Sequence, residues 1–220
     1  MIRVLDVVFS GLALLLLLPL FLVVMVVLRL TGEGEVFYRQ ERAGQQGRSF
    51  DLLKFVTMVK DSPNIGTGVL TVKNDPRILP IGHFLRNTKI NELPQLVNVL
   101  LGDMSLIGPR PLARPHFDAL PKDVQAVLAH GKPGLSGIGS IVFRHEEDVL
   151  ERAQDRANFH ANVISPYKAK VETWYLQHRS LPLYLTLIFL TVWVVLVPSS
   201  TLYRKLLKGL PEPPPELQGL

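Results

Sequence analysis

The sequence predicts a mainly helical α+β domain flanked by two apolar, membrane-associated segments. Three observations lead to this fold class. An uncharged apolar run covers residues 7–28, short β-type segments follow it, and from Ile90 onward apolar residues recur at three- and four-residue spacing. We therefore divide the chain into an N-terminal membrane segment (1–30), a domain (31–180), a second apolar segment (181–200) and a proline-rich tail (201–220).

Composition narrows the classes of function. The chain has 220 residues, 47% of them hydrophobic, with 24 Lys and Arg against 19 Asp and Glu and a net charge of +5. This modest basic excess suits anionic lipid headgroups or phosphate-bearing substrates. The sequence contains no cysteine, so disulfides, thiolate catalysis and cysteine zinc sites are excluded. No nucleic acid is expected as a partner, because no helix-turn-helix pattern and no interleaving of aromatic and basic residues is present.

The first apolar run is long enough to cross a hydrocarbon core of about 30 Å as a helix. It is too long for a signal peptide, and no small-residue cleavage site follows it. Pro19 near its middle removes a backbone hydrogen bond and kinks the helix. Two interpretations stay open: a kinked spanning helix, or a helix–break–helix that enters and leaves by the same membrane face. Arg3 and Arg29 do not decide between them, because each end carries a cation.

The domain is predicted to begin with a β-hairpin. Residues 36–38 and 50–58 are β-type, and a polar, glycine-containing turn separates them. The loop that follows contains Gly66 and Gly68. A Gly-Thr-Gly sequence alone is weak evidence for a phosphate cradle, so we interpret it as a plain turn.

Two helical stretches are predicted next. The three-four spacing indicates a helix that starts near Asn91, carries Pro94 in its first turn and ends at Gly102. A second, charge-rich helical stretch is expected over residues 146–174. Residues 181–198 then form an uncharged apolar run that is slightly short for a membrane span but has interfacial aromatics. The segment 208–220 is rich in proline and is expected to be disordered.

The chemistry of the chain centres on Asn91 and Glu92. A purely structural explanation exists, because asparagine is a good N-cap and the helix dipole favours a carboxylate in the first turn. The same helix start can attract a phosphate, and cations are frequent nearby: Arg77, Arg86, Lys89, Arg110 and Arg114. Two prolines flank Arg110 and restrict the backbone around a guanidinium suited to bidentate phosphate binding. Carboxylate, arginine and phosphate together suggest phosphoryl transfer with Mg²⁺ bridging carboxylate and phosphate oxygens.

Three stretches carry a family resemblance: LLKFVTM, NDPRILPIGHFLRNTKINELPQLVNVLLGDMSLIGPRPL and KPGLSGIGSIVF. They resemble the bacterial sugar transferases, the monotopic phosphoglycosyl transferases, and the similarity extends from the N-terminal helix to about Leu190. The resemblance implies transfer of a sugar-1-phosphate from a nucleotide-diphosphate sugar, with UDP the usual carrier, to polyprenyl phosphate. Such a reaction starts assembly of a glycan such as capsule, exopolysaccharide or O-antigen.

The same resemblance implies where the protein works and with what. It implies a re-entrant N-terminal helix broken at Pro19, a small catalytic domain on the cytoplasmic face of the bacterial inner membrane, and contact with membrane lipids. Mg²⁺ is the implied cofactor. The oligomeric state stays open, and a homodimer is compatible with the sequence. The family's Ser–Pro break reads Leu18–Pro19 here, so the break residue is kept and the hydroxyl is missing. Residues 183–190 lack the charges that many members carry there, so this segment is expected to lie deeper in the bilayer.

The sequence departs from the family at its catalytic pair. The family has Asp–Glu, and its Asp attacks the β-phosphate to form a covalent phosphosugar intermediate. Here the pair reads Asn91–Glu92, and an amide is a poor nucleophile and a weak metal ligand beside a carboxylate. Four alternatives stay open. In the first, Glu92 is the nucleophile and metal ligand while Asn91 orients phosphate or metal. In the second, Asp103 supplies the missing carboxylate, and in the third, the sugar-phosphate is transferred directly without a covalent intermediate. In the fourth, the protein is a disabled membrane scaffold that binds lipid phosphate. We favour activity carried by Glu92, because so much of the surrounding pattern is present.

Substrate-binding residues are implied by the same resemblance. Lys54 matches a lysine near the active site of the family. Arg86 and Arg110 match positions suited to hold a diphosphate, with ion pairing to nearby carboxylates as the alternative role. Arg77 is a further candidate for substrate binding, although it could equally form a local ion pair with Asp75 in a turn. The sugar and the nucleobase are not readable from these residues.

Overall fold

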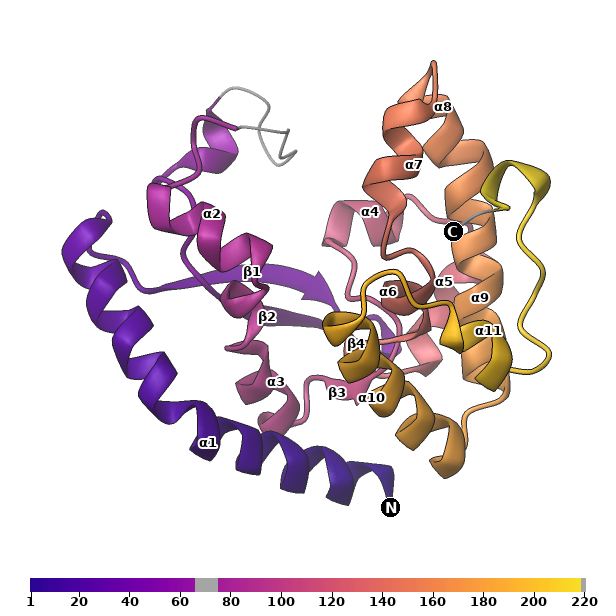
Figure 1. Cartoon of the computed structure of the whole chain (residues 1–220), viewed down its shortest axis with the longest axis horizontal. Helices are drawn as coiled ribbons and strands as arrows, with labels where there is room; N and C mark the ends of the chain where they lie inside the picture. Colours follow the sequence, from indigo (N-terminus) through magenta and orange to yellow (C-terminus); the bar gives the residue numbers. More distant parts are fainter. Residues whose placement is uncertain (66–74, 219–220) are drawn as a thin grey trace.

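A computed structural model of the chain describes residues 1–65 and 75–218. Within these residues helices dominate and the strands form two small sheets, one antiparallel and one parallel. The mainly helical α+β class predicted from the sequence is therefore confirmed. Figure 1 shows the antiparallel hairpin near the centre, the long N-terminal helix along one side and the C-terminal helices on the other.

Helix α1 (Ile2–Thr31) is a single 30-residue helix that continues through Pro19 and curves along the side of the domain (Figure 1). Among the described residues it is the one helix long and apolar enough to cross a membrane. Its second half packs on the domain in a cluster that contains Phe21, Val24, Leu28, Phe55 and Leu85. The opposite face exposes large apolar side chains, including Leu12, Leu15, Leu16, Leu22, Val23 and Val26. The helix is thus apolar on both faces but packed on only one.

Strands β1 (Phe37–Ala43) and β2 (Ser49–Phe55) form the predicted hairpin, so that expectation is confirmed. The register places Tyr38 opposite Lys54. Because side chains alternate along a strand, Tyr38 and Arg42 share a face with Lys54. This face of the hairpin carries part of the candidate site.

Helix α2 (Pro80–Asn87), the 3₁₀ turn η3 (Ile90–Glu92) and helix α3 (Gln95–Leu101) follow in sequence. Proline in the first turn of α2 fits there, because a first-turn residue has no intrahelical partner for its N–H. Helix α3 ends at Gly102, whose φ of 102° is the left-handed conformation that glycine adopts freely. The predicted end of this helix is therefore confirmed.

Two polar side chains fix α3 to its neighbours. Arg3 of α1 donates to the carbonyl oxygens of Val99 and Leu100 at 2.5 and 2.8 Å, and so satisfies the C-terminal end of the helix. Asn98 faces the other way, accepting from one β2 amide at 3.0 Å and donating to a β2 carbonyl at 2.8 Å. Helix α3 therefore joins α1 to strand β2 of the hairpin.

The second sheet pairs β3 (Ser105–Ile107) in parallel with β4 (Gly134–Ser136). The turn that follows β3 packs so closely on β4 that a Cβ on Gly108 would overlap backbone atoms of the β4 side. Two of the motifs recognised in the sequence, GDMSLIGPRP and KPGLSGIGS, are thus brought together here. The connection between the two strands contains α4 (Arg114–Asp118) and α5 (Lys122–His130).

The helical stretch predicted over residues 146–174 is confirmed except at residues 153–155, where the chain leaves the helical conformation. The chain forms α6 (Ile138–Val142), α7 (Glu146–Arg152), α8 (Arg156–Phe159), the π-helical turn η4 (His160–Ile164) and α9 (Ser165–Gln177). Helix α7 stops because its C-cap, Ala153, is extended, with φ −79° and ψ 135°. Residues 156–177 form one continuous helical run, because the π-helical turn η4 joins α8 directly to α9 and its flanking residues keep helical backbone angles.

Helix α10 (Leu181–Leu196) buries Tyr184, Leu187, Leu190 and Val194 on one face. Its other face leaves apolar side chains exposed, Phe189 and Val192 among them. The disorder predicted for residues 208–220 is wrong for the described residues 208–218, which lie against the domain. Leu217 is 1% exposed in the main core, and the Tyr167 hydroxyl donates to the carbonyl of Pro211 at 2.8 Å. Leu210 before the prolines and Leu217 after them pack on the main core, and this burial orders a segment that proline content alone suggested was mobile.

Asp6 joins helix α1 to the core. Its Oδ1 accepts hydrogen bonds from the Ser105 hydroxyl at 2.9 Å, the Leu106 amide at 2.9 Å and the Tyr184 hydroxyl at 2.7 Å. The side chain is only 2% exposed. One carboxylate thus links α1, β3 and α10, and it fixes the first turn of α1 against the domain.

Candidate active site

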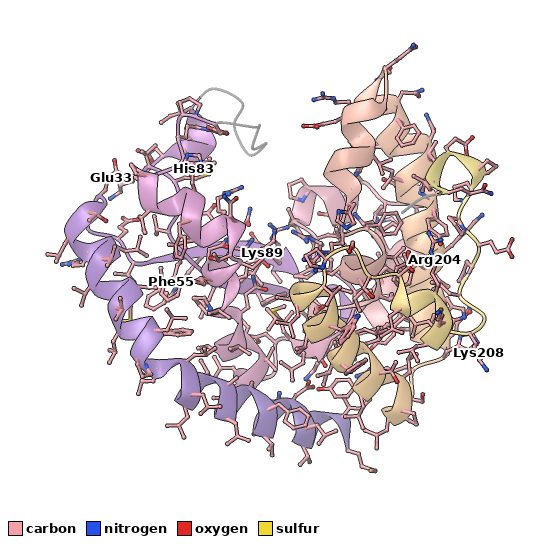
Figure 2. All side chains as sticks on the ribbon, in the orientation of Figure 1. Glu33, Phe55, His83, Lys89, Arg204 and Lys208 are labelled. Carbon is pink, nitrogen blue, oxygen red and sulfur yellow. The ribbon has the colours of Figure 1, made fainter. Side chains whose placement is uncertain are left out.

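Asn91 and Glu92 lie in the short turn η3 between α2 and α3. Lys89 enters this turn with φ of 61°, a left-handed conformation that is uncommon for a residue other than glycine, and the Glu92 amide donates back to its carbonyl. In Figure 2 Lys89 lies near the centre of the molecule, at the base of α2. The sharp reversal brings the η3 turn against β2, and so it sets the position of Glu92.

The prediction that Asn91 caps α3 is wrong. Helix α3 begins later, at Gln95, with Pro94 at its N-cap and no side-chain capping bond. Asn91 is 8% exposed, and its Oδ1 is buried with no hydrogen-bond partner among the described residues. The extra 3₁₀ turn displaces the helix start by several residues, which moves the asparagine side chain away from the amides it would cap. A buried acceptor without a partner is costly, so Asn91 Oδ1 is suited to bind a donor or a cation.

Glu92 faces Lys54 of β2. Their Nζ and Oε1 atoms lie 3.6 Å apart, and the side chains are 18% (Lys54) and 28% (Glu92) exposed. Burial lowers the pKa of Lys54, and the nearby Glu92 acts in the opposite direction. The lysine is therefore a desolvated cation next to a carboxylate that remains accessible from solvent.

Arg42 of β1 adds a second cation to this group. Its Nη1 donates to the carbonyl of Pro111 at 3.2 Å and its Nη2 to Gln40 Oε1 at 2.5 Å, whereas its Nε is buried without a partner in the described part of the chain. Burial, and then the charge of Arg110, lowers the pKa of Arg42. A buried guanidinium with a free N–H is a donor ready for an anion.

Arg110 supplies the third cation from the turn after β3. Its charge acts on both Lys54 and Arg42, which places its guanidinium close to them. The residue is exposed, and the turn that carries it is held between Gly108 and Pro111 against β4. The backbone is therefore rigid while the guanidinium remains accessible.

Segments far apart in the sequence thus converge on Glu92. The site contains Arg42, Lys54, Asn91, Glu92 and Arg110, from β1, β2, η3 and the turn after β3. Three cations against one carboxylate leave an excess of positive charge, which favours an anionic ligand with several oxygens. The partly exposed carboxylate of Glu92 within this cationic group is placed to act on such a ligand. The arrangement is chemically suited to a phosphate or diphosphate.

The oxygen atoms of this site can bind Mg²⁺ only together with oxygen atoms of a bound substrate. Within residues 1–65 and 75–218, no group of three or more Asp, Glu or His side chains forms a ready-made cation site. Mg²⁺ is commonly held by one or two protein oxygens together with substrate phosphates and water. Glu92 and the unpartnered Asn91 Oδ1 match that pattern.

Two other predicted binding residues lie outside this group. Arg86, on α2, approaches the Thr57 hydroxyl at 3.4 Å, just beyond the end of β2. Arg77 is 5% exposed and pairs with Asp75 at 2.6 Å, while its Nη1 binds the carbonyls of Ser62 and Ile65. Of the two roles left open for Arg77, the structure shows the local ion pair, which closes the loop before α2.

Asp103 lies at the opposite end of α3 from Glu92, because the whole helix separates them. It is exposed, and its Oδ2 accepts from Asn98 at 3.3 Å. The structure therefore does not bring it together with Glu92 as a substitute carboxylate. Pro19 lies within α1, and Gly66 and Gly68 fall outside the described residues.

Sequence reasoning missed Arg42. The alternation of Tyr38, Gln40 and Arg42 along β1 contained the signal, because a correct hairpin register places this row beside Lys54. Arg42 was overlooked because it lies 50 residues before Glu92 and next to other charges that face solvent.

Comparison with known proteins gives a consistent result. The family model described as bacterial sugar transferase matches residues 1–198. The UDP-glucose:undecaprenyl-phosphate glucose-1-phosphate transferase of Klebsiella pneumoniae is 35% identical over 196 residues, which cover 87% of this chain and 39% of that protein. The exopolysaccharide production protein ExoY of Rhizobium meliloti is 34% identical over 165 residues, 68% of this chain and 72% of that protein.

A third relative is the undecaprenyl-phosphate galactose phosphotransferase of Salmonella typhimurium. It is 32% identical over 177 residues, which cover 74% of this chain and 34% of that protein. The chain thus spans well under half the length of the Klebsiella and Salmonella relatives, and most of the length of ExoY.

Proposed function

Because the chain belongs to the bacterial sugar transferase family, we propose that it transfers a sugar-1-phosphate from a UDP-sugar to undecaprenyl phosphate. The products are undecaprenyl-diphosphate-sugar and UMP, and the lipid-linked sugar starts a glycan such as an exopolysaccharide. The name of the Klebsiella relative supports this donor and acceptor, that of the Salmonella relative supports the acceptor, and that of ExoY supports an exopolysaccharide as the product. The observation that carries the proposal is the convergence of three cations from three segments on the partly exposed carboxylate of Glu92.

Glu92 is the reacting carboxylate in this proposal. One of its oxygens attacks the β-phosphorus of the UDP-sugar, and the bond from that phosphorus to the bridging oxygen breaks, so UMP leaves with the bond electrons. A phosphate oxygen of undecaprenyl phosphate then attacks the same phosphorus and releases the Glu92 carboxylate. The exposure of Glu92 and the length of its 3.6 Å ion pair with Lys54 support this role, since they leave carboxylate lone pairs available.

The surrounding cations stabilise the charge that develops during transfer. Lys54, Arg42 and Arg110 face the diphosphate as fixed positive groups, and the free N–H of Arg42 provides a donor. Asn91 Oδ1 and Glu92 are the residues that would hold Mg²⁺, which neutralises diphosphate oxygens when bound. In this proposal Asn91 orients ligand or metal and does not react.

Release of UMP tests the proposal. The purified chain, in detergent or lipid discs, is given Mg²⁺, undecaprenyl phosphate and a panel of UDP-sugars. We expect UMP from the chain as it stands, none from Glu92→Gln, and normal release from Asp103→Asn, a matched carboxylate at the far end of α3. Turnover by Asn91→Asp alone would show that the natural chain is disabled. Binding of donor and lipid without any UMP would favour a non-catalytic scaffold.

We further propose that α1 is re-entrant and that the catalytic domain faces the cytoplasm. Support comes from the two ends of α1, which both contact the same domain. Arg3 and Asp6 bind α3 and β3 near the first turn, and Leu28 packs with Phe55 near the last. A helix that crossed the bilayer would place its ends on opposite sides, and one aqueous domain could not reach both.

Thiol labelling tests this topology, because the sequence contains no cysteine. One variant carries a cysteine added before Met1 and another carries Glu35→Cys. With a membrane-impermeant reagent, we expect both to react in inverted vesicles and neither to react in intact spheroplasts. Labelling of the two positions from opposite sides would show that α1 spans the membrane.

A further inference from the structure

A buried carboxyl group lies directly behind the Arg110 turn. Glu172 of α9 is 6% exposed, and its Oε2 has no hydrogen-bond partner among the described residues. A buried carboxyl group with an unused oxygen is expensive to keep, and nothing in the packing of α9 requires one. The proposed transfer chemistry does not use it directly either.

The other oxygen of Glu172 faces backbone groups of the site. The backbones of Arg110 and Gly139 face the carboxyl group and lower its pKa, against the larger effect of burial. A Cβ on Gly139 would overlap Glu172 Oε1, so this approach needs glycine at position 139. Tyr175, three residues further along the same helix, donates its hydroxyl to the carbonyl of Ile107 at 3.1 Å. One face of α9 therefore holds the backbone on both sides of the Gly108–Pro109 step.

The charged and titratable groups around Glu172 explain why its protonation state matters. Lys168 and Tyr175 face it from α9, Arg110 approaches from the turn, and α6 contributes only the backbone of Gly139. Lys168 is already engaged with Glu146 at 2.7 Å. Burial raises the pKa of Glu172 to about 8, so the group is largely neutral at pH 7. In the neutral state it does not compete with a bound anion for the charge of Arg110.

We propose that Glu172 is a positioning residue for the donor diphosphate, holding the Arg110 backbone so that the guanidinium faces Glu92. The inference rests on the proposed function, because it takes the UDP-sugar diphosphate as the ligand of Arg110. The backbone of Arg110 faces Glu172 on one side of the turn, while the charge of its side chain acts on Lys54 and Arg42 on the other. Ionisation of Glu172 adds a negative charge behind the same turn and weakens binding of the diphosphate.

A double-mutant cycle with UDP-sugar binding as the readout tests the coupling. Glu172→Ala, Arg110→Ala and the double variant are compared by calorimetry in detergent. We expect Glu172→Ala to weaken affinity about tenfold in the natural background and less than about twofold when Arg110 is already alanine. Equal losses in both backgrounds would show a general structural effect, and no loss in the natural background would overturn the proposal.

Glu172→Gln provides the conservative control and the pH test. Glutamine keeps an oxygen acceptor for the backbones of Arg110 and Gly139, stays neutral and does not titrate. At pH 7 we expect Glu172→Gln to bind the UDP-sugar as tightly as the natural chain does. Between pH 7 and 9 the affinity of the natural chain should fall below that of Glu172→Gln. Identical pH profiles would overturn the role of ionisation.

UDP-sugar binding and UMP release are measured separately, so a failure of the proposed transfer can be distinguished from a failure of the proposed role of Glu172. If the chain binds UDP-sugar without releasing UMP, the proposed transfer fails while the cycle still measures the role of Glu172. If the chain binds no UDP-sugar at all, both proposals are overturned.

Discussion

Two carboxylates in this protein are used in opposite ways. Asp6 is 2% exposed, and three donors converge on its Oδ1. Glu92 is 28% exposed and meets Lys54 at the long separation of 3.6 Å. A carboxylate oxygen saturated with short hydrogen bonds fixes structure, and one with unused lone pairs inside a cationic group is available for chemistry. The comparison teaches that the number of hydrogen-bonded lone pairs, rather than the residue type, distinguishes a carboxylate that holds the structure together from one that can react.

The largest expected effect on stability concerns Asp6. Asp6→Ala leaves the Ser105 hydroxyl, the Leu106 amide and the Tyr184 hydroxyl without their shared acceptor. Because hydrogen bonds to a charged group contribute about 1.5–3 kcal/mol each, we expect a loss of about 3 kcal/mol or more. The thermal unfolding midpoint in detergent measures it, with Asp6→Asn as the milder change that keeps one acceptor. An unchanged unfolding midpoint for Asp6→Ala would show that Asp6 does not stabilise the fold, and would contradict the structural role that distinguishes it from Glu92.

Lys54 should affect catalysis more than stability. Lys54→Met is expected to lower UMP release by roughly a hundredfold, because it removes a desolvated positive charge beside the reacting carboxylate. Burial lowers the pKa of Lys54, so its charge is lost as pH rises, and at a lower pH than for an exposed lysine. Activity of the natural chain should therefore decline at alkaline pH, whereas Lys54→Arg should keep its charge there. Parallel alkaline profiles for the two proteins would contradict this assignment.

Arg42 should affect mainly substrate binding. Arg42→Gln removes the buried, unpartnered N–H that we propose as a donor to the diphosphate, and we expect KM for the UDP-sugar to rise roughly tenfold. Arg39 on the same strand is exposed and points to the other face of the hairpin, so Arg39→Gln is the matched control. If both substitutions change KM equally, the effect comes from general charge and not from the free N–H.

The smallest expected effect is at Asp103. This carboxylate is exposed and binds Asn98 at 3.3 Å at the far end of α3. We expect Asp103→Asn to change the rate of UMP release by less than about twofold, since surface substitutions of this kind cost little. A loss comparable to that of Glu92→Gln would mean that Asp103 reaches the reacting phosphate after all.

Local patterns were enough to predict the elements near the site. Two β-type segments around a polar, glycine-containing turn predicted the hairpin, three-four spacing with Gly102 predicted the end of α3, and the uncharged run predicted α1. These features depend on neighbours within a few residues. The predicted cap at Asn91 failed because an extra 3₁₀ turn precedes α3, and the sequence gives no local sign of it.

Long-range pairings could not be predicted in the same way. Asp6 meets partners 99 and 178 residues away, and no periodicity connects them. Arg42 and Glu172 likewise acquire their roles only when the hairpin and α9 pack against the Arg110 turn. The order of the proline-rich tail depends on the leucine that it buries in the main core, Leu217.

The most direct test of Glu92 as the reacting carboxylate is a single-turnover experiment without acceptor. The chain is mixed with Mg²⁺ and a UDP-sugar in the absence of undecaprenyl phosphate, and both UMP release and the intact mass of the protein are measured. We predict release of about one UMP per chain and a mass increase equal to one sugar-phosphate, both abolished by Glu92→Gln. UMP release that requires undecaprenyl phosphate, with no gain in protein mass, would contradict the role of Glu92 and favour direct transfer.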